Sequence, residues 1–174
     1  MSVTYVGAQG VRTHAFVCRK DVKGYYANID QSILTSLVSE YVHDSKVLAL
    51  VDLYLRRFVA TGNEYVDIKR GISLGCPLSL LMGALYLKPL DDRMAALGCF
   101  YVRFMDDWVV LVSTRWKLRK AVKAINEELT ALRVEKSPEK TFIGRIAKRF
   151  DFLGYWFSRV LVFARGGGRG EKDR

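Results

Sequence analysis

The sequence predicts an α+β fold, in which a mixed sheet packs against helices. Three observations point to this class: strand-like and helix-like segments alternate along the 174 residues, 50% of the residues are hydrophobic, and a hairpin-like stretch, YVRFMDDWVVLV, lies well inside the chain. This length suits one domain with a sizeable core. The predicted order is strand, helix, helix, strand, helix, hairpin, helix, strand and strand, which favours an α+β arrangement.

The first part of the chain predicts a strand, two helices and a short second strand. HAFVCRKDV, residues 14–22, is typical of a strand that delivers Asp21 near its end. Asn28 or Asp30 is expected to cap the first helix. The apolar stripe of the second helix comprises Val47, Leu50, Val51, Tyr54, Leu55 and Phe58. Residues 61–63 predict a turn, and EYVDIKR alternates as a short strand.

The second part begins with Pro77, which suits the first turn of a long helix running to about Leu97. Residues 100–113 predict a hairpin with FMDD, residues 104–107, at its tip. A basic amphipathic helix is expected over residues 116–132, and KTFIGRI and FDFLGYWF predict the last strands. We expect one domain over residues 1–160 and a disordered Gly- and Arg-rich tail over residues 161–174.

The charge of the chain favours an acidic partner. The net charge is +10 and the sequence pI is about 9.6, which indicates nucleic acid first, an anionic membrane surface second, or simply a solvated basic face. Residues 101–174 carry 17 Lys and Arg against 9 Asp and Glu, whereas residues 1–100 carry 11 against 9. No apolar run reaches the roughly 18 residues of a membrane span. Three scattered cysteines exclude a disulfide framework and favour a cytoplasmic setting.

Asp106 and Asp107 lie between two runs of aromatic and β-branched residues. Buried carboxylates without compensation are costly, so the pair points to a cation or an ion-pair partner; a polar hairpin turn is the alternative, since Asp favours turns. If the strand that delivers Asp21 neighbours this hairpin, three carboxylates meet at one end of the sheet. Hard oxygen ligands suit Mg²⁺, and two such ions about 4 Å apart clamp the oxygens of a phosphoryl transfer.

Five sequence blocks follow one another in a fixed order over most of residues 15–157. They are KDVKGYYANID, RGISLGCPLS with a later PLDD, FMDD, VEKSPEKT and FDFLGYWF. In this order they resemble the palm of reverse transcriptases, which are RNA-directed DNA polymerases, and particularly the bacterial types allied to group II intron proteins of mobile elements. The resemblance implies a polymerase palm-like fold, with an antiparallel or mixed sheet packed against helices.

The resemblance also implies a role for each matching position. Asp21, Asp106 and Asp107 match the metal-binding triad for two Mg²⁺ ions, which Mn²⁺ can replace, and the Val22 carbonyl is a further ligand. Lys140 matches the cation that protonates departing pyrophosphate, although an exposed strand-edge lysine is the alternative.

The remaining matches concern the nucleotide and the primer. The nucleotide-binding positions are Val22, Gly24, Tyr25, Tyr26, Leu74 and Gly75. Tyr26 falls at the steric gate that disfavours a 2′-hydroxyl, with packing against Tyr25 as the alternative. Phe152, Leu153 and Gly154 are implied to support the primer strand, while as plain sequence they are also typical of a core. Ser73 and Leu74 stand where many relatives carry Pro-Gln, so a side-chain amide contact is missing.

The implied reaction joins a deoxynucleoside triphosphate to a primer 3′-hydroxyl on an RNA template. The N-terminal part of the fingers and the thumb are expected to be absent from this chain, so we expect little activity alone unless another chain supplies them; no membrane partner is expected. One alternative is a catalytically idle RNA-binding or maturase-like remnant. The other is a further palm-type nucleotidyl enzyme such as a nucleotide cyclase, against which the lack of a Gly-Gly-Asp/Glu-Glu/Asp-Phe hairpin counts.

Overall fold

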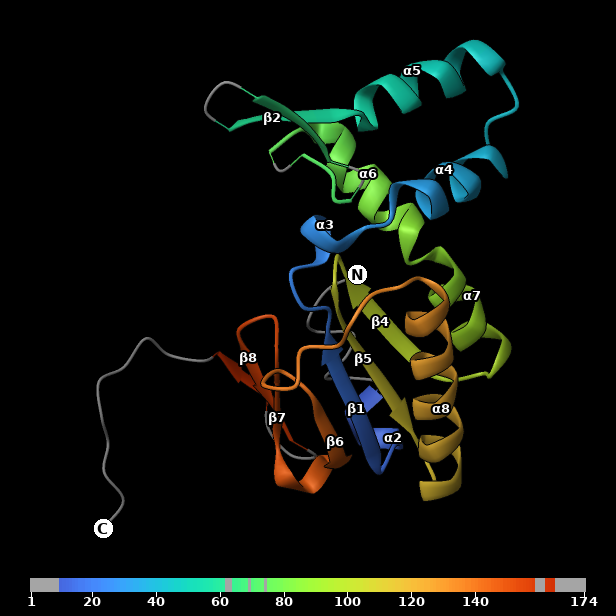
Figure 1. The fold of residues 1–174 in the computed structure, drawn as a ribbon. Coiled ribbons are helices and arrows are strands. Elements are labelled where there is room, and N and C mark those ends of the chain that lie inside the picture. Colours follow the sequence, from blue (N-terminus) through green and yellow to red (C-terminus); the bar gives the residue numbers. More distant parts are fainter. Residues whose placement is uncertain (1–9, 62–63, 69, 74, 159–161, 165–174) are drawn as a thin grey trace.

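The predicted α+β class is confirmed, and its centre is an antiparallel sheet (Figure 1). The computed structural model describes residues 10–61, 64–68, 70–73, 75–158 and 162–164. The central sheet has four strands in the order β4–β5–β1–β6. Their bounds are Phe16–Asp21 for β1, Phe100–Phe104 for β4, Asp107–Val112 for β5 and Phe142–Arg145 for β6. The strand delivering Asp21 and the FMDD hairpin are therefore neighbours, as the sequence analysis required.

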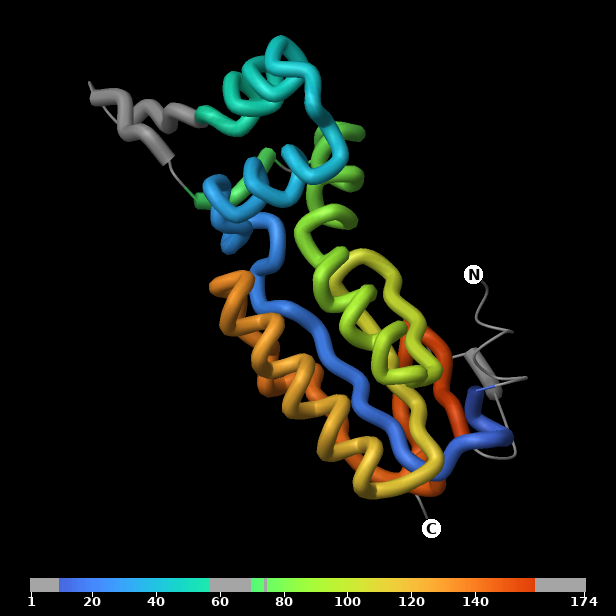
Figure 2. The backbone as a smooth tube through the Cα atoms, turned by 90° about the vertical axis from the view of Figure 1, so that its right-hand side faces the viewer, coloured from blue at the N-terminus to red at the C-terminus, as the bar shows by residue number. Residues whose placement is uncertain are grey.

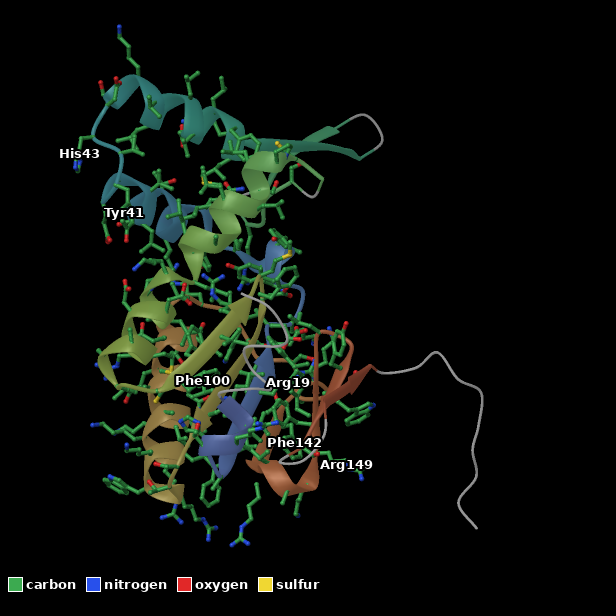
Figure 3. The ribbon with its side chains drawn as sticks, turned by 180° about the vertical axis from the view of Figure 1, so that it is seen from behind. Arg19, Tyr41, His43, Phe100, Phe142 and Arg149 are labelled. Carbon is green, nitrogen blue, oxygen red and sulfur yellow. The ribbon has the colours of Figure 1, made fainter. Side chains whose placement is uncertain are left out.

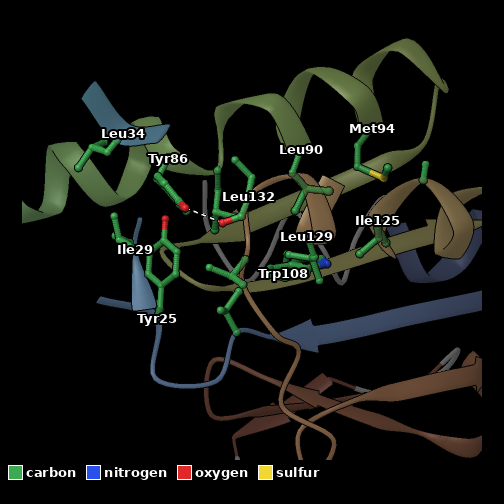
Figure 4. Close-up of a cluster of buried hydrophobic side chains, with 14 of the residues drawn as sticks. Tyr25, Ile29, Leu34, Tyr86, Leu90, Met94, Trp108, Ile125, Leu129 and Leu132 are labelled. Atoms are coloured by element: carbon green, nitrogen blue, oxygen red, sulfur yellow. Dashed lines mark hydrogen bonds between the residues drawn. The ribbon is translucent and has the colours of Figure 1, made fainter. Parts of the chain in front are cut away.

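One face of the sheet is covered by helices α7 (Lys88–Ala96) and α8 (Arg115–Ala131). Figure 2 shows α8 running along β1. Because side chains alternate along a strand, Cys18 of β1 and Trp108 and Val110 of β5 share this face. They pack with Leu90 of α7 and with α8 side chains in one buried cluster (Figure 4).

The other face of the sheet is covered by a second, smaller sheet. Its strands are β7 (Phe150–Phe152), β8 (Tyr155–Phe157) and β9 (Val162–Ala164), in that order. Phe150, Phe152 and Phe157 are buried there against Val17, Val109 and Leu111 of the central strands. A short helix, α2 (Val11–Thr13), adds Val11 to the same cluster, and a 3-10 turn, η2 (Ile146–Lys148), joins β6 to β7. The central strands are thus buried on both faces, which accounts for their near-continuous apolar sequence.

The remaining elements lie beyond the Asp21 end of β1 (Figure 1). They are α3 (Tyr25–Asn28), α4 (Gln31–Ser39), α5 (Ser45–Leu55), the hairpin of β2 (Arg57–Thr61) with β3 (Glu64–Ile68), and α6 (Pro77–Tyr86). Asp30 caps α4, because its carboxylate accepts from the backbone N–H groups of Ser32 and Ile33. Helix α4 packs against both α5 and α6.

The structure corrects several predicted boundaries. The long helix from Pro77 is two helices, since it breaks at Leu87, immediately before the helix that carries Pro89 in its first turn. FDFLGYWF is a hairpin, whose turn residues Leu153 and Gly154 both have positive φ, at 50° and 78°. Residues 162–164, assigned to the tail, form β9 and pair with β8; residues 165–174 lie outside the described part.

The predicted apolar stripe of α5 is only partly buried. Val51 and Leu55 are buried, whereas Leu50 is 65% exposed, because α5 packs on α4 along a narrow face. Phe58 of the same predicted stripe lies in strand β2 instead. No helix in the described ranges is long and apolar enough to cross a membrane.

Candidate active site

Two of the predicted acids face each other across the central sheet. Asp21 and Asp107 are partners in the antiparallel register of β1 with β5, so their side chains leave the same face of the sheet. Asp106 precedes Asp107 in the turn between β4 and β5, and its carbonyl accepts a hydrogen bond from the Val22 N–H at 3.3 Å. The structure therefore brings all three carboxylates to one end of the sheet.

The turn that carries Asp106 is held in place by Arg103. Met105, its first residue, has a φ of 54°, a backbone conformation uncommon for a residue with a side chain. The Arg103 guanidinium donates to the Met105 carbonyl at 2.9 Å and to the Asp91 carboxylate at 2.7 Å. Asp91 belongs to α7, so the turn is anchored to the helical layer.

Lys140 is the direct partner of Asp21. Its ammonium donates to the Asp21 carboxylate at 2.8 Å, while the backbone carbonyl of Asp21 accepts from the Ser137 N–H, also at 2.8 Å. The Asp21 side chain is only 9% exposed and that of Lys140 is 59% exposed. This hydrogen bond raises the pKa of Lys140, so the lysine is a partly solvated cation that reaches into the acidic site.

Arg19 is the ion-pair partner of Asp107. Its guanidinium donates to Asp107 at 3.1 Å and to Asp151 of β7 at 3.2 Å, and Figure 3 labels it on the central sheet. The Arg19 side chain is 12% exposed. One carboxylate oxygen of Asp107, Oδ1, is buried without a hydrogen-bond partner among the described residues.

Burial weakens the acidity of both hairpin acids. Burial raises the pKa of Asp106, and the neighbouring Asp21 raises it further. Burial also raises the pKa of Asp107, against the opposing effect of Arg19. In both cases the ionised form is incompletely compensated by its surroundings.

No group of three or more His, Cys, Asp and Glu side chains in the described part of the chain is already arranged as a metal site. Lys140 contacts a carboxylate oxygen of Asp21, and Arg19 contacts a carboxylate oxygen of Asp107.

The tyrosines after Asp21 lie on one side of this cluster. Gly24 has a φ of 53° and begins α3, a conformation that glycine adopts without strain. Tyr25 is buried and donates its hydroxyl hydrogen bond to the Gly83 carbonyl of α6. Tyr26 is half-buried, contacts Tyr25 edge to face, and has its pKa raised by burial and by the charge of Asp106. A Cβ on Gly83 would lie 3.0 Å from the Tyr26 ring, so Gly83 leaves the space that this ring fills.

The glycine-containing loop lies before α6. Gly75 has a φ of 84° and is exposed, and a Cβ there would meet nothing within 4 Å. Leu74 lies outside the described residues. Ser79 has a structural position, because its buried hydroxyl bonds to the Ser73 carbonyl and to the Tyr54 hydroxyl.

The three residues matched to primer support separate into two environments. Phe152 is fully buried in the cluster under the small sheet, so its side chain supports the fold. Leu153 and Gly154 form the β7–β8 turn, where Gly154 is exposed. Of these three residues, only the two in this turn are accessible to a ligand.

The sequence analysis missed Arg19, Arg103 and Asp151. Each lies in a predicted strand, and the pairings of Arg19 with Asp107 and Asp151 join residues distant in sequence. The available signal was a charged residue inside an otherwise apolar strand, which is costly unless it is paired.

A family model for reverse transcriptase (RNA-dependent DNA polymerase) matches residues 8–157. Among solved structures, apo telomerase from Candida tropicalis, truncated from its C-terminal domain, is similar over 86% of this chain and 35% of its own, with a TM-score of 0.71 and 17% identity. Telomerase from Candida albicans, in complex with a TWJ fragment of telomeric RNA, is similar over 96% of this chain and 33% of its own, with a TM-score of 0.75 and 13% identity.

These identities establish a shared fold, and the chain spans about a third of the length of those telomerases. No curated protein matches the sequence. The family match covers most of the chain and includes every acid of the candidate site; the chain belongs to the reverse transcriptase (RNA-dependent DNA polymerase) family.

Proposed function

We propose that this chain is the palm of an RNA-directed DNA polymerase of the bacterial, group II intron-like kind, which acts in the cytoplasm on behalf of a mobile element. It joins a deoxynucleoside triphosphate to a DNA primer 3′-hydroxyl on an RNA template. One observation carries the proposal: Asp21 lies opposite Asp107 in the β1–β5 register, with Asp106 in the adjoining turn.

The acids fit two Mg²⁺ ions, with Mn²⁺ as a substitute. Asp21, Asp106, Asp107 and the Val22 carbonyl offer the hard oxygen donors that Mg²⁺ prefers. The unpartnered Oδ1 of Asp107 and the raised pKa values of Asp106 and Asp107 mark negative charge that a cation would compensate. When bound, such ions lower the pKa of the attacking hydroxyl and stabilise charge on pyrophosphate.

Lys140 supplies a proton and a positive charge. It is bonded to Asp21 without a nucleotide, and its exposed side chain leaves it free to transfer to a triphosphate. A lysine side chain is protonated at neutral pH, so Lys140 has a proton that it can donate to departing pyrophosphate as a general acid.

The segment after Asp21 binds the nucleotide. The backbone N–H groups of Gly24 and Tyr25 face the triphosphate, and the Tyr26 ring lies against the sugar and disfavours a 2′-hydroxyl. Support comes from the position of Tyr26 beside Asp106, whose charge raises its pKa. The backbone at Leu74 and Gly75 runs close to the nucleotide and the template, and the Leu153–Gly154 turn supports the primer.

The RNA template is supported by charge and by the family. The net charge of +10 suits a phosphate backbone, and the Candida albicans telomerase was solved with a telomeric RNA fragment. Because the chain spans only about a third of the length of those telomerases, we propose that these residues have little activity without the fingers and thumb parts of a complete polymerase.

Primer extension tests this function. The assay uses a labelled DNA primer on an RNA template, with Mg²⁺ and deoxynucleotides, and compares the chain with Asp106→Ala and with Asp92→Ala. Asp92 is an exposed acid paired with Lys88, so its loss controls for charge alone. We expect weak extension by the wild type and the control, and none by Asp106→Ala.

A catalytically idle RNA-binding remnant is the second candidate. It is favoured by the ion pairs of Asp21 with Lys140 and of Asp107 with Arg19, because each acid already has a cationic partner within the chain. RNA binding without extension, together with Mg²⁺ affinity equal in the wild type and Asp106→Ala, would establish this candidate and reject the polymerase.

A further inference from the structure

A groove runs along α8, on the side of that helix which faces the edge of the central sheet. It has a volume of about 1280 Å³, and every turn of α8 from Arg115 to Ala131 contributes to it. Its opposite wall is β6, from Phe142 to Arg145, and η2. The groove is lined by none of the acids of the candidate active site.

The floor of the groove is apolar. Phe16 of β1, Leu118 and Val122 of α8, and Ile143 of β6 line it. Ile143 is 44% exposed, and it pairs with Cys18 in the register of β1 with β6, which directs both side chains to the α8 face. Covering this exposed isoleucine and its partly buried apolar neighbours would remove apolar surface from water, which is energetically favourable.

Both rims of the groove are basic. Arg115, Arg119 and Lys123 follow one another along α8, and Arg145 and Lys148 lie on the opposite wall. Glu127 is the acid among the lining residues. The fully buried Lys20 donates to Asn126, another lining residue, at 2.9 Å.

Most of these cations form no ion pair that stabilises the described part of the fold. Arg115, Arg119, Arg145 and Lys148 form no ion pair with another residue of the described ranges, and Lys123 approaches Glu127 only to 3.8 Å. The first half of α8 carries Arg115, Lys117, Arg119, Lys120 and Lys123 and has no acid in its first turn. Cations at a helix N-terminus oppose the helix dipole, so this arrangement lowers the stability of α8.

The wall formed by β6 is also an open edge. Among the described strands, β6 pairs with β1 alone. Unpaired strand edges in proteins are covered by a helix or a loop, or are blunted by charge. A helix lying in this groove covers the edge and the apolar floor together.

We infer that this groove binds an acidic amphipathic helix of a partner protein. An apolar stripe on that helix meets Phe16, Val122 and Ile143, and acids on either side of the stripe meet the two basic rims. A nucleic acid would satisfy the rims but would leave aliphatic side chains against sugar and phosphate. The 17 residues of α8 span about 25 Å, which sets the partner helix at about four to five turns.

The 174 residues themselves do not supply this helix. Residues 1–9 contain no Asp or Glu, and residues 165–174 contain Arg165, Arg169, Lys172 and Arg174 against two acids. Neither segment therefore has the net negative charge that would complement the two basic rims.

The test is binding of a labelled designed peptide of about 17 residues, with leucine on one face and glutamate on both flanks, followed by fluorescence anisotropy. A scrambled peptide of the same composition is the control for amphipathicity. The groove variant is Arg119→Glu with Lys123→Glu. The matched control is Lys117→Glu with Lys120→Glu, which makes the same charge change on residues of α8 that do not line the groove.

We expect the ordered peptide to bind and the scrambled one to bind at least about tenfold more weakly, with a further loss of about tenfold in the groove variant and little change in the control. Ile143→Ser, which removes floor area without changing charge, is expected to weaken binding too. Circular dichroism melting establishes that each variant is folded.

Absence of saturable peptide binding overturns the inference, as does equal loss in the groove and control variants. A labelled single-stranded RNA that binds and is displaced by neither peptide, but is weakened by both double variants, identifies a nucleic-acid surface instead and overturns it too. Asp106→Ala is expected to leave peptide binding unchanged, so this result and that of primer extension are independent.

Discussion

Asp21 and Asp107 face each other across β1 and β5, and each is held by a different cation. Lys140 bonds to Asp21 with a side chain that is 59% exposed, whereas Arg19 bonds to Asp107 with one that is 12% exposed. Like charges directly opposite in a sheet destabilise it, so the two cations compensate the pair. Because of this difference in exposure, Lys140 can move away from Asp21, whereas Arg19 is a structural residue.

Replacing Lys140 tests this difference. In Lys140→Met the Asp21 carboxylate loses its competing partner, so we expect Mg²⁺ to bind more tightly and to raise the melting temperature more than in the wild type. Nucleotide incorporation should fall by about tenfold or more, as for loss of a general acid. Lys136→Met, which removes a nearby cation that forms no ion pair with a described residue, is the control. An unchanged Mg²⁺-dependent melting shift in Lys140→Met would contradict the prediction.

The raised pKa of Asp106 predicts a pH dependence of stability. The folded protein holds the Asp106 proton more tightly than the unfolded chain does, because of burial and then the nearby Asp21. The free energy of unfolding therefore falls as the pH rises above about 4, the ordinary carboxyl range. Without divalent ions, Asp106→Asn should be more stable than the wild type at neutral pH, and the difference should shrink toward pH 3. Urea unfolding at several pH values measures it, and a pH-independent difference would refute it.

Arg19 is predicted to support the fold as well as the site. Arg19→Met removes the cation that pairs with both Asp107 and Asp151, so we expect a loss of about 2–4 kcal/mol in the free energy of unfolding. Arg19→Lys should recover only part of it, because an ammonium does not reach two carboxylates as a planar guanidinium does. Asp52→Ala, which breaks the exposed Asp52–Arg56 pair, should cost less than about 0.5 kcal/mol. Equal losses at the two sites, in urea unfolding, would show that Arg19 is not a structural residue.

Tyr86 joins the helices at the Asp21 end to the helical layer below them. Its buried hydroxyl donates to the Leu132 carbonyl at 2.5 Å and accepts from the Asp30 N–H at 3.1 Å (Figure 4). Tyr86→Phe leaves both partners without this bond, and we expect a loss of about 1–3 kcal/mol in the free energy of unfolding. The exposed Tyr155→Phe should change it by less than about 0.5 kcal/mol. Chemical denaturation compares the two, and similar values would disprove the role of Tyr86.

Gly83 sets the position of the proposed steric gate. A Cβ there would lie 3.0 Å from the Tyr26 ring and 3.2 Å from that of Tyr25. Gly83→Ala should therefore displace Tyr26 and change the ratio of kcat/KM for deoxynucleotides to that for ribonucleotides, whereas Gly98→Ala, in open space at the end of α7, should not. An unchanged ratio in Gly83→Ala would show that the position of Tyr26 does not determine the discrimination between deoxyribose and ribose.

Part of this protein follows from local sequence alone. The aromatic and β-branched residues of β4 and β5 with Asp106 at the turn predict a hairpin, because strand propensity and turn preference are local properties. The helix cap at Asp30 and the Pro77 start of α6 were predicted for the same reason. Motif order also predicts the three acids as a group without reference to strand pairing.

Only the tertiary structure decided which charges meet. Arg19 and Asp151 are separated by 132 residues, and the packing of β7 against the central sheet brings them together. The same holds for Lys140 with Asp21, which are separated by 119 residues. The exposed face of α5 and the buried position of Phe152 were likewise decided by neighbours distant in the chain. Local sequence sets what each segment prefers to be, whereas burial and pairing energies depend on contacts that exist only after the segments have packed.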